Sequence, residues 1–286
     1  MMPVLKGGSM LRKFGIVLFI LTLVIAFSAC GGKEEAGSEA AKAPAKASTP
    51  KVVPGEMVLI PEGEFILGTD DKEHPTAYTT NRNMSLPAFW IDKYEVTNME
   101  FMDFSIKANY AGEGAKEGKD WRIFFTPEKA NVPVVFITYN DAEAYCKANG
   151  KRLPTEFEWE KAGRGTEGFR YPWGNDWDAS KTNTYESGFE SPVAIGKFVD
   201  DMSPFGVHDM MGNVQEWTSS KYLPYKGGKK DPNASEDMKV VRGLSYLYRG
   251  RLGSIYERTA YVPNYLSNFG FRCAKDATPE EAAGAQ

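Results

Sequence analysis

The spacing of apolar side chains along this chain predicts many short elements. Apolar and polar positions alternate through residues 56–70 on either side of Pro61, which is typical of two strands joined as a hairpin. Residues 86–91 favour a further strand. From Thr97 onward the spacing becomes helical, and Glu100 stands where it completes a capping box with that threonine.

Later in the chain, residues 112–130 are polar and irregular, and they predict a long surface loop. Residues 132–165 predict a short strand and two helices, the first capped by Asn140 or Asp141 and the second by Thr155. Two late runs, DMKVVRGLSYL and FGFRCAKD, predict strands. This pattern indicates an α+β fold with short sheets, two or three helices and much irregular structure.

The first residues predict a secretory signal. Arg12 and Lys13 precede an apolar run that ends at Cys30, and this run is shorter than a comfortable membrane span. The ending Phe-Ser-Ala-Cys resembles the lipobox of bacterial lipoproteins, in which the cysteine becomes the lipidated first residue. We therefore expect residues 1–29 to be a lipoprotein signal peptide; the alternative is an uncleaved membrane anchor.

Composition separates the folded part from its flanks. Residues 30–54 are rich in Ala, Lys, Glu and Pro and nearly devoid of large apolar side chains, so we expect a flexible tether. We expect one domain over residues 55–276 and a disordered tail over 277–286. The formal net charge of −4 favours neither nucleic acid nor an anionic surface, so we expect no nucleic-acid partner.

Cysteine use suits an oxidising compartment. If Cys30 carries lipid, only Cys146 and Cys273 remain. A disulfide between them is the simplest interpretation, and two buried free thiols are the alternative. Either way, little thiol chemistry is left for catalysis.

The segment FGVHDMMGNVQEWTSSKY, residues 205–222, places two carboxylates around a Gly-Asn pair and a tryptophan. A tight turn explains the Gly-Asn pair, and a buried anchor explains the tryptophan. The two carboxylates among backbone turns could instead wrap a metal ion.

The ordered motifs RLPTEFEWEKAGRG, YPWGN, GNVQEW, VVRGLSY and NFGFRCAKD resemble the sulfatase-modifying-factor (formylglycine-generating enzyme) family over essentially residues 55–276. The resemblance implies a variant of the C-type lectin fold. It also implies several possible activities, because the family includes copper-dependent cysteine oxidases, iron-dependent sulfoxide synthases and accessory lipoproteins.

Neither redox centre of the family has its ligands in this sequence. The copper enzymes use two thiolates shortly after the motif that reads GLSY here, and residues 247–261 contain no cysteine. The iron enzymes use paired histidines, whereas His74 and His208 are the only histidines of the chain and have no partner at helical spacing. We therefore expect neither copper nor iron.

Calcium is the metal that the resemblance implies. Calcium prefers carboxylate and carbonyl oxygens, and the expected ligands are Asp209, Gly212, Val214 and Glu216. The alternative is that Asp209 and Glu216 cap turns or meet arginine side chains.

Without a redox centre, the equivalent pocket would still offer aromatic and arginine side chains for a peptide or glycan: Tyr246, Tyr248, Arg249, Arg258 and Asn268. The alternative is that the arginines are structural. We expect a lipid-anchored binding or scaffolding module of the bacterial cell envelope, facing the periplasm or the exterior, at the outer membrane in a two-membrane host. A divergent protein-modifying enzyme is the alternative function.

Overall fold

The computed structural model describes residues 51–70, 82–118, 120–225, 231–264 and 266–284. These residues belong to one compact unit, Ser48–Gln286. Cys30, the expected signal peptide and most of the expected tether lie outside the described residues. No helix in the described ranges has the length and hydropathy needed to cross a membrane.

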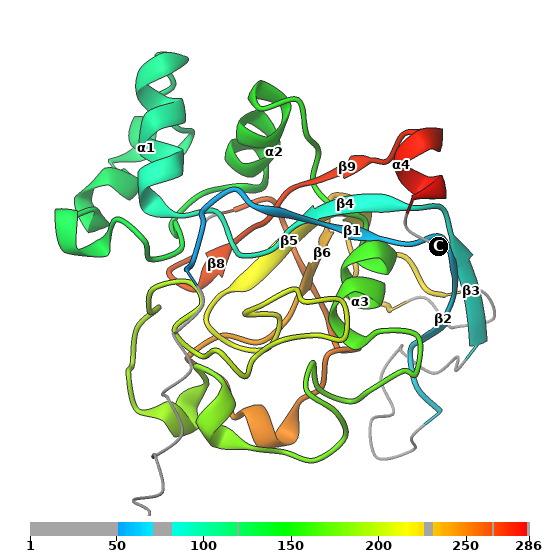
Figure 1. Ribbon diagram of the computed structural model, residues 1–286. Helices are drawn as coiled ribbons and strands as arrows, with labels where there is room; N and C mark the ends of the chain where they lie inside the picture. The colour runs from blue at the N-terminus through cyan, green and yellow to red at the C-terminus, as the bar shows by residue number, and fades with distance from the viewer. Residues whose placement is uncertain (1–50, 71–81, 119, 226–230, 265, 285–286) are drawn as a thin grey trace, which may run out of the picture. The chain divides into compact units, whose positions relative to one another are not determined.

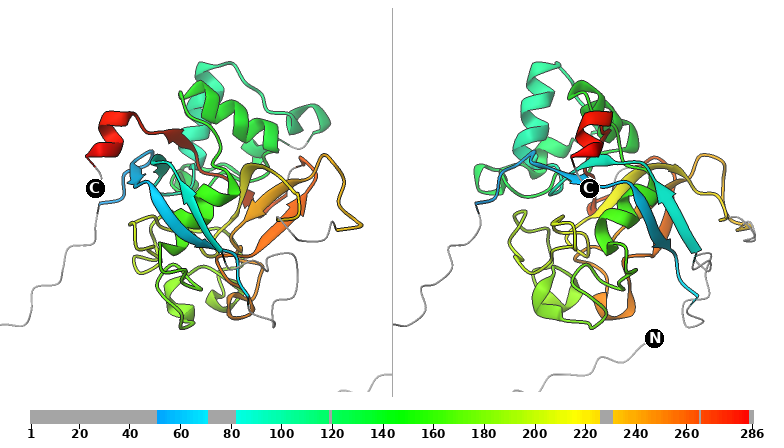
Figure 2. Two further views of the ribbon diagram at one scale, coloured as in Figure 1. Left: turned by 90° about the vertical axis from the view of Figure 1, so that its right-hand side faces the viewer. Right: turned by 45° about the vertical axis from the view of Figure 1, so that its right-hand side comes forward.

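A three-stranded antiparallel sheet joins the two ends of the domain (Figures 1 and 2). Its order is β1 (Met57–Ile60), β4 (Phe89–Asp92) and β9 (Ala274–Asp276). Strand β2 (Gly63–Leu67) pairs instead with β3 (Arg82–Leu86) in a separate two-stranded sheet.

The expected hairpin of the first two strands is therefore wrong, although both strands exist. Pro61 has no N–H for a ladder, and Gly63 adopts φ +127°, so the chain leaves the first sheet between them. Beyond this bend, Phe65 and Leu67 are buried against Tyr225 in a different apolar cluster.

A four-stranded sheet carries the motifs singled out in the sequence. Its order is β7 (Arg258–Tyr261), β6 (Lys239–Arg242), β5 (Gln215–Lys221) and β8 (Phe269–Gly270), with β5 and β8 parallel. Strand β5 lies inside the sheet, and Trp217 on it is completely buried. The two late runs predicted as strands correspond to β6 and to β8 with β9.

The three longest helices begin at capping boxes. Thr97 and Glu100 cap α1 (Asn98–Lys107), and Thr155 caps α3 (Glu156–Arg164), as the sequence predicts. Helix α2 (Tyr139–Ala148) begins earlier than expected, because Thr138 rather than Asn140 or Asp141 is its cap. The Asp141 carboxylate instead accepts the Thr138 N–H at 2.8 Å, as the third residue of a capping box.

Irregular segments contain short helical turns. The loop expected at residues 112–130 holds three 3₁₀ turns, η1 (Gly114–Glu117), η2 (Trp121–Phe124) and η3 (Pro127–Lys129). Three more follow at η4 (Ala179–Lys181), η5 (Tyr185–Ser187) and η6 (Gly250–Leu252). Where a disordered tail is expected, Thr278 caps a short helix, α4 (Pro279–Ala283).

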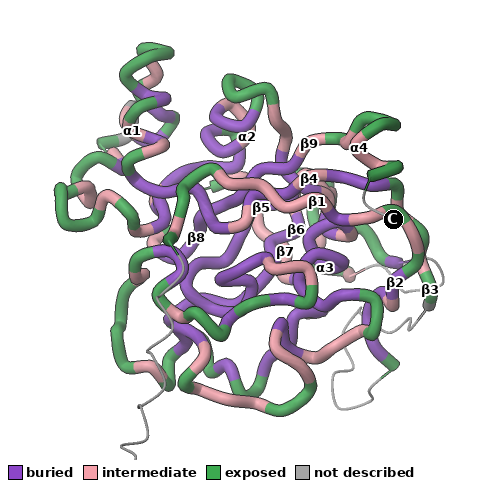
Figure 3. Tube along the Cα trace, viewed as in Figure 1, coloured by how far each residue is buried: buried purple, intermediate pink, exposed green. Residues whose placement is uncertain are grey.

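The largest apolar cluster lies between α1, α2 and the four-stranded sheet (Figure 3). Phe101, Tyr145 and Phe271 stack edge to face or in parallel within it. The disulfide Cys146–Cys273 crosses the same cluster and ties α2 to the segment before β9, with Cα atoms 5.7 Å apart. The expected disulfide is thus present.

Candidate functional site

The Gly-Asn turn before β5 is buried, and its backbone conformation and one backbone hydrogen bond fix its position. Asp209 and Asn213 both have φ +56°, and Gly212 has φ +95°. A Cβ on Gly212 would lie 2.6 Å from the carbonyl oxygen of Asn183, so only glycine fits there. The N–H of Asn213 donates to that same carbonyl at 2.8 Å, which fastens the turn to the segment between η4 and η5.

Glu216 is a buried ion-pair partner. Its Oε2 accepts hydrogen bonds from Arg272 Nε at 2.7 Å and from Trp159 Nε1 at 2.8 Å, and its Oε1 accepts one from Arg272 Nη2 at 2.7 Å. All three side chains are 1% exposed or less. This bidentate pair is the arginine contact that the sequence left open as the alternative to calcium.

Asp209 lies in a buried acidic cluster with Glu95 and Asp201, which sequence reasoning missed. Its carboxylate accepts the Gly196 N–H at 2.7 Å. Burial raises the pKa of Asp209 to about 6. Burial first, and then the charge of Asp209, also raise the pKa of Glu95 and of Asp201 well above the ordinary range.

Two oxygens of this cluster have no donor. Among the described residues, no hydrogen-bond partner reaches Glu95 Oε2 or Asp201 Oδ1, and both side chains are 1% exposed. Four buried carboxyl groups, counting Glu216, thus lie near one buried guanidinium, that of Arg272. In charge and donor type this excess of oxygen fits a hard cation such as calcium.

The positions of these side chains fit a metal ion less well than their charges do. Within the part of the chain that the structure describes, no three acidic, histidine or cysteine side chains converge as metal ligands do. A calcium site at Asp209 and Glu216 would therefore draw on backbone carbonyls, as the sequence suggests for Gly212 and Val214. Calcium binding stays a prediction.

His208 is a packed residue. Its ring stacks on Tyr94 with centroids 5.1 Å apart, and burial lowers its pKa to about 4. It is neutral at physiological pH and serves the packing of the turn.

Arg258 does not reach the expected binding surface. It is 2% exposed, and its Nη2 donates to Glu156 Oε1 at 2.6 Å. Arg242 donates to Glu156 and Glu160 in the same network, at 3.0 and 2.8 Å. These arginines join α3 to β6 and β7 and are structural.

Beneath the predicted surface, Asn268 and Tyr246 are buried. Asn268 Nδ2 donates to Ser245 Oγ at 3.2 Å and to Gln215 Oε1 at 3.3 Å. The Tyr246 N–H donates to the carbonyl of Asn213 at 3.2 Å. Both residues therefore support the surface from below.

Tyr248 and Arg249 are the exposed members of the predicted set. Tyr185 from η5, which the sequence did not single out, lies beside them. The guanidinium carbon of Arg249 lies 4.9 Å from the Tyr185 ring centroid, and the Tyr185 N–H donates to the carbonyl of Tyr248 at 2.9 Å. Burial, and then a hydrogen bond with Tyr248, raise the pKa of Tyr261 to about 12. Aromatic and arginine side chains thus share one face.

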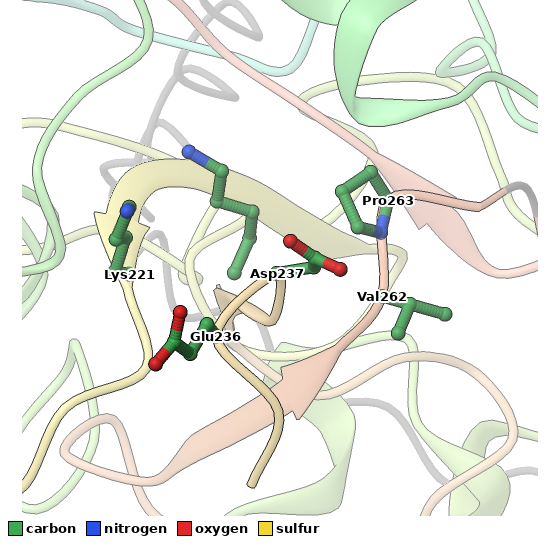
Figure 4. Close-up of a pocket in the computed structure, with 6 residues that line it drawn as sticks. Lys221, Glu236, Asp237, Val262 and Pro263 are labelled. Atoms are coloured by element: carbon green, nitrogen blue, oxygen red, sulfur yellow. The ribbon is translucent and has the colours of Figure 1, made fainter.

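A pocket of about 420 Å³ opens where β5 and β7 end and β6 begins (Figure 4). Tyr261 connects it to Tyr248, because Tyr261 stands opposite Lys239 in the sheet. Lys221 and Lys239 are direct cross-strand partners, and the Lys239 ammonium lies 4.2 Å from the Tyr139 ring centroid. The full lining is Lys221, Glu236, Asp237, Lys239, Val262 and Pro263.

This pocket was also missed in the sequence, because its charged residues come from separate strands and a connecting loop. It presents both signs of charge beside an apolar wall of Val262 and Pro263, which Figure 4 shows on the side away from Lys221. Such a lining suits an extended peptide that carries charged side chains.

Comparisons with known proteins match this fold and these motifs. Residues 42–277 match the family model of the sulfatase-modifying factor enzyme 1-like domain. The mouse protein named inactive C-alpha-formylglycine-generating enzyme 2 is 32% identical, with 77% of this chain and 86% of that protein aligned. Bovine formylglycine-generating enzyme is 30% identical over 87% of this chain and 86% of its own length.

A solved structure supports the same assignment. PvdO from Pseudomonas aeruginosa superimposes with a TM-score of 0.61 at 25% identity, covering 77% of this chain and 94% of PvdO. The α+β architecture with short sheets, expected from the motifs, is thus shared with a solved relative. The chain belongs to the sulfatase-modifying factor enzyme 1-like family.

Proposed function

We propose that this chain is a non-catalytic binding module of its family, anchored by lipid to the bacterial cell envelope. One observation carries the proposal. The segment that would supply copper thiolates presents Tyr248 and Arg249 instead, and Cys146 and Cys273 are joined in a disulfide within the core. No cysteine of the domain is left to bind copper or to form a mixed disulfide with a substrate.

The proposed ligand is an extended peptide segment of an envelope protein. Tyr185, Tyr248 and Arg249 supply aromatic faces and a guanidinium, side chains that recur where binding energy concentrates in protein interfaces. The adjoining pocket adds two lysines and two acidic residues. A glycan would use the aromatic faces but has less use for charges of both signs.

The relatives support this choice without deciding it. One of them is named an inactive formylglycine-generating enzyme, so the family also includes a protein that is named as lacking this activity. The bovine relative is named for the active enzyme. The proposal places this chain with the former group, because its site offers no thiol.

Anchoring and calcium complete the proposal. Lipid on Cys30 and the flexible tether expected over residues 30–54 would hold the domain at a membrane surface, facing the periplasm or the exterior. Calcium would neutralise part of the buried acidic cluster around Asp209 and act as a structural ion, with Gly212, Val214 and Glu216 as further ligands.

The experiment has two parts on the full-length chain. In the first, the chain is given copper(I), oxygen and a synthetic peptide containing the modifiable cysteine of a sulfatase, with bovine formylglycine-generating enzyme as positive control. Mass spectrometry should find no formylglycine from this chain. Formation of formylglycine would sink the proposal and favour a divergent enzyme.

In the second part, a photo-crosslinking amino acid replaces Tyr248 in cells, and the matched control carries it at Ile106 on α1, which is 71% exposed. Position 248 should crosslink to a defined peptide segment of an envelope protein, and position 106 should not. Equal crosslinking at both positions would argue against a specific surface.

A further inference from the structure

We propose that a patch of apolar side chains beside the start of the described chain lies against the lipid bilayer. The patch, here called the tether-side patch, consists of Val53, Phe189, Val199 and Met202. These residues are 44, 43, 43 and 48% exposed. The inference rests on the proposed lipid anchor at Cys30, because that anchor is what would bring a bilayer to this face.

Contacts bring the loop of Phe189 and Val199 next to the first described residues (Figure 1). A Cβ built on Gly196 would lie 2.8 Å from Val52, so the two segments pack directly. The rings of Phe189 and Phe198 are 6.1 Å apart, edge to face. Phe189 and Val199 are therefore held in one loop beside the point where residues 1–50 join the domain.

A continuous ladder of backbone contacts links Met202 to Val53. Met202 forms a β-bridge with His208, whose N–H donates to the Lys93 carbonyl at 2.9 Å. The Lys93 N–H donates to Glu56 at 2.8 Å, and the Glu56 N–H donates to Val53 at 3.2 Å. Four exposed apolar side chains thus come from segments joined by direct contacts.

The position of the patch in the chain identifies its occupant. Only residues 31–50 separate Cys30 from Lys51, so a lipidated Cys30 keeps this face within reach of the bilayer at high effective concentration. A contact too weak to hold a free protein can then be populated. An unidentified protein partner would have no such reason to meet this particular face.

Charge around the patch points to apolar contact rather than attraction to anionic lipid. Lys51 and Lys197 are balanced by Glu190 and Asp200 in the same segments, and all four are exposed. The Lys197 ammonium lies 3.9 Å from the Phe189 ring centroid. Docking should therefore change little between low and high salt.

The test places an environment-sensitive fluorophore on Val199→Cys in the full-length lipidated chain, reconstituted on vesicles of phosphatidylethanolamine and phosphatidylglycerol. The matched control is Val262→Cys, because Val262 is also an exposed valine, at 46%, but lies at the pocket beyond β7. Emission at position 199 should shift to shorter wavelength on vesicles, and emission at 262 should not. Identical emission at both positions would overturn the inference.

Two further experiments distinguish failure of the lipid anchor and self-association of the chain from docking on the bilayer. If Cys30 carries no lipid, the protein will not float with vesicles, and the anchoring proposal fails alone. Docking is then tested by holding Cys30→Ala, with an N-terminal histidine tag, on vesicles containing nickel-chelating lipid. A blue shift at 199 that appears without vesicles, as protein concentration rises, would identify a second copy of the chain as the occupant and contradict the lipid assignment.

Discussion

Replacing Glu216 with glutamine tests whether the Gly-Asn turn before β5 is stabilised chiefly by an ion pair. The substitution keeps the shape of the side chain but leaves the Arg272 guanidinium without its carboxylate in a fully buried position. Removing one partner of a buried pair costs about 3–5 kcal/mol, because the remaining charge is uncompensated. Arg272 also donates to the carbonyls of Asp92 and His208, so we expect the lower end, about 3 kcal/mol.

The assay is urea unfolding of the wild type and Glu216→Gln, each with excess calcium and with a calcium chelator. The ion pair predicts a loss in the chelator, where no calcium is bound. A calcium site adds to this loss, because calcium stabilises the wild type by about 2.7 kcal/mol at a concentration one hundred times its Kd and the variant by less. The control is Glu143→Gln, which breaks the exposed pair with Lys147 and should cost under about 1 kcal/mol.

Two results would refute parts of this reasoning. A stability of Glu216→Gln within about 1 kcal/mol of wild type in the chelator would show that the pair with Arg272 contributes little net free energy. A wild-type stability that calcium leaves unchanged would remove the calcium site from the proposal. Because the two results are independent, the ion-pair interpretation of Glu216 and the calcium interpretation can each be rejected without the other.

Three other predictions concern the core and the surface. Reducing the Cys146–Cys273 disulfide, which spans 127 residues, should lower the unfolding free energy by about 5 kcal/mol in the chain-entropy model, measured by urea unfolding with and without reductant. Because the folded pKa of Asp209 is raised to about 6, the folded state holds its proton more tightly; without calcium, the stability that Asp209 contributes, measured as wild type minus Asp209→Asn, should fall as pH rises from about 4 through about 6, whereas the stabilisation by calcium should grow over that window. The comparison with Asp209→Asn removes the opposite contribution of His208, whose pKa, lowered to about 4, makes stability rise with pH over the same window. A difference that rises across that window in the chelator would contradict this sign. The free energy of unfolding of Tyr248→Ala should lie within about 0.5 kcal/mol of wild type. Arg258→Ala should lose about 3 kcal/mol, because it removes the donor of Glu156 Oε1 and leaves Arg242 alone to balance Glu156 and Glu160. Equal losses would mean that the surface and the core are not separate.

Local signals in the sequence were enough for most elements. Thr97 with Glu100 and Thr155 with Glu158 form capping boxes, which depend on residues three apart, and both helices begin where predicted. The α2 boundary was misplaced because Thr138 precedes two other good caps, and only the hydrogen bond with Asp141 decides between them. N-cap propensity ranks residue types, but it does not decide which of several neighbouring candidates begins the helix.

Partners distant in the sequence could not be predicted in the same way. The hairpin at residues 56–70 looked local, yet β1 pairs with β4 and β4 with β9, because the first sheet gains its third strand from the end of the chain. Glu95 and Asp201 meet Asp209 only after the turn has folded. The available signal for Glu95 was an acidic residue between two apolar neighbours, Tyr94 and Val96, because a carboxylate buried with them needs partners.

The arginines show most clearly why this scaffold can change its function without losing its fold. Arg242, Arg258 and Arg272 are each buried against carboxylates of α3 or β5, and none of them reaches the surface around Tyr248. That surface is made from η5 and the residues just before η6, which contribute little to the core. Under the proposed function, the absence of thiolates there would remove redox chemistry, while the disulfide and the buried ion pairs keep the domain folded. Loss of catalysis and retention of binding would then be compatible in one structure, because different residues would carry them.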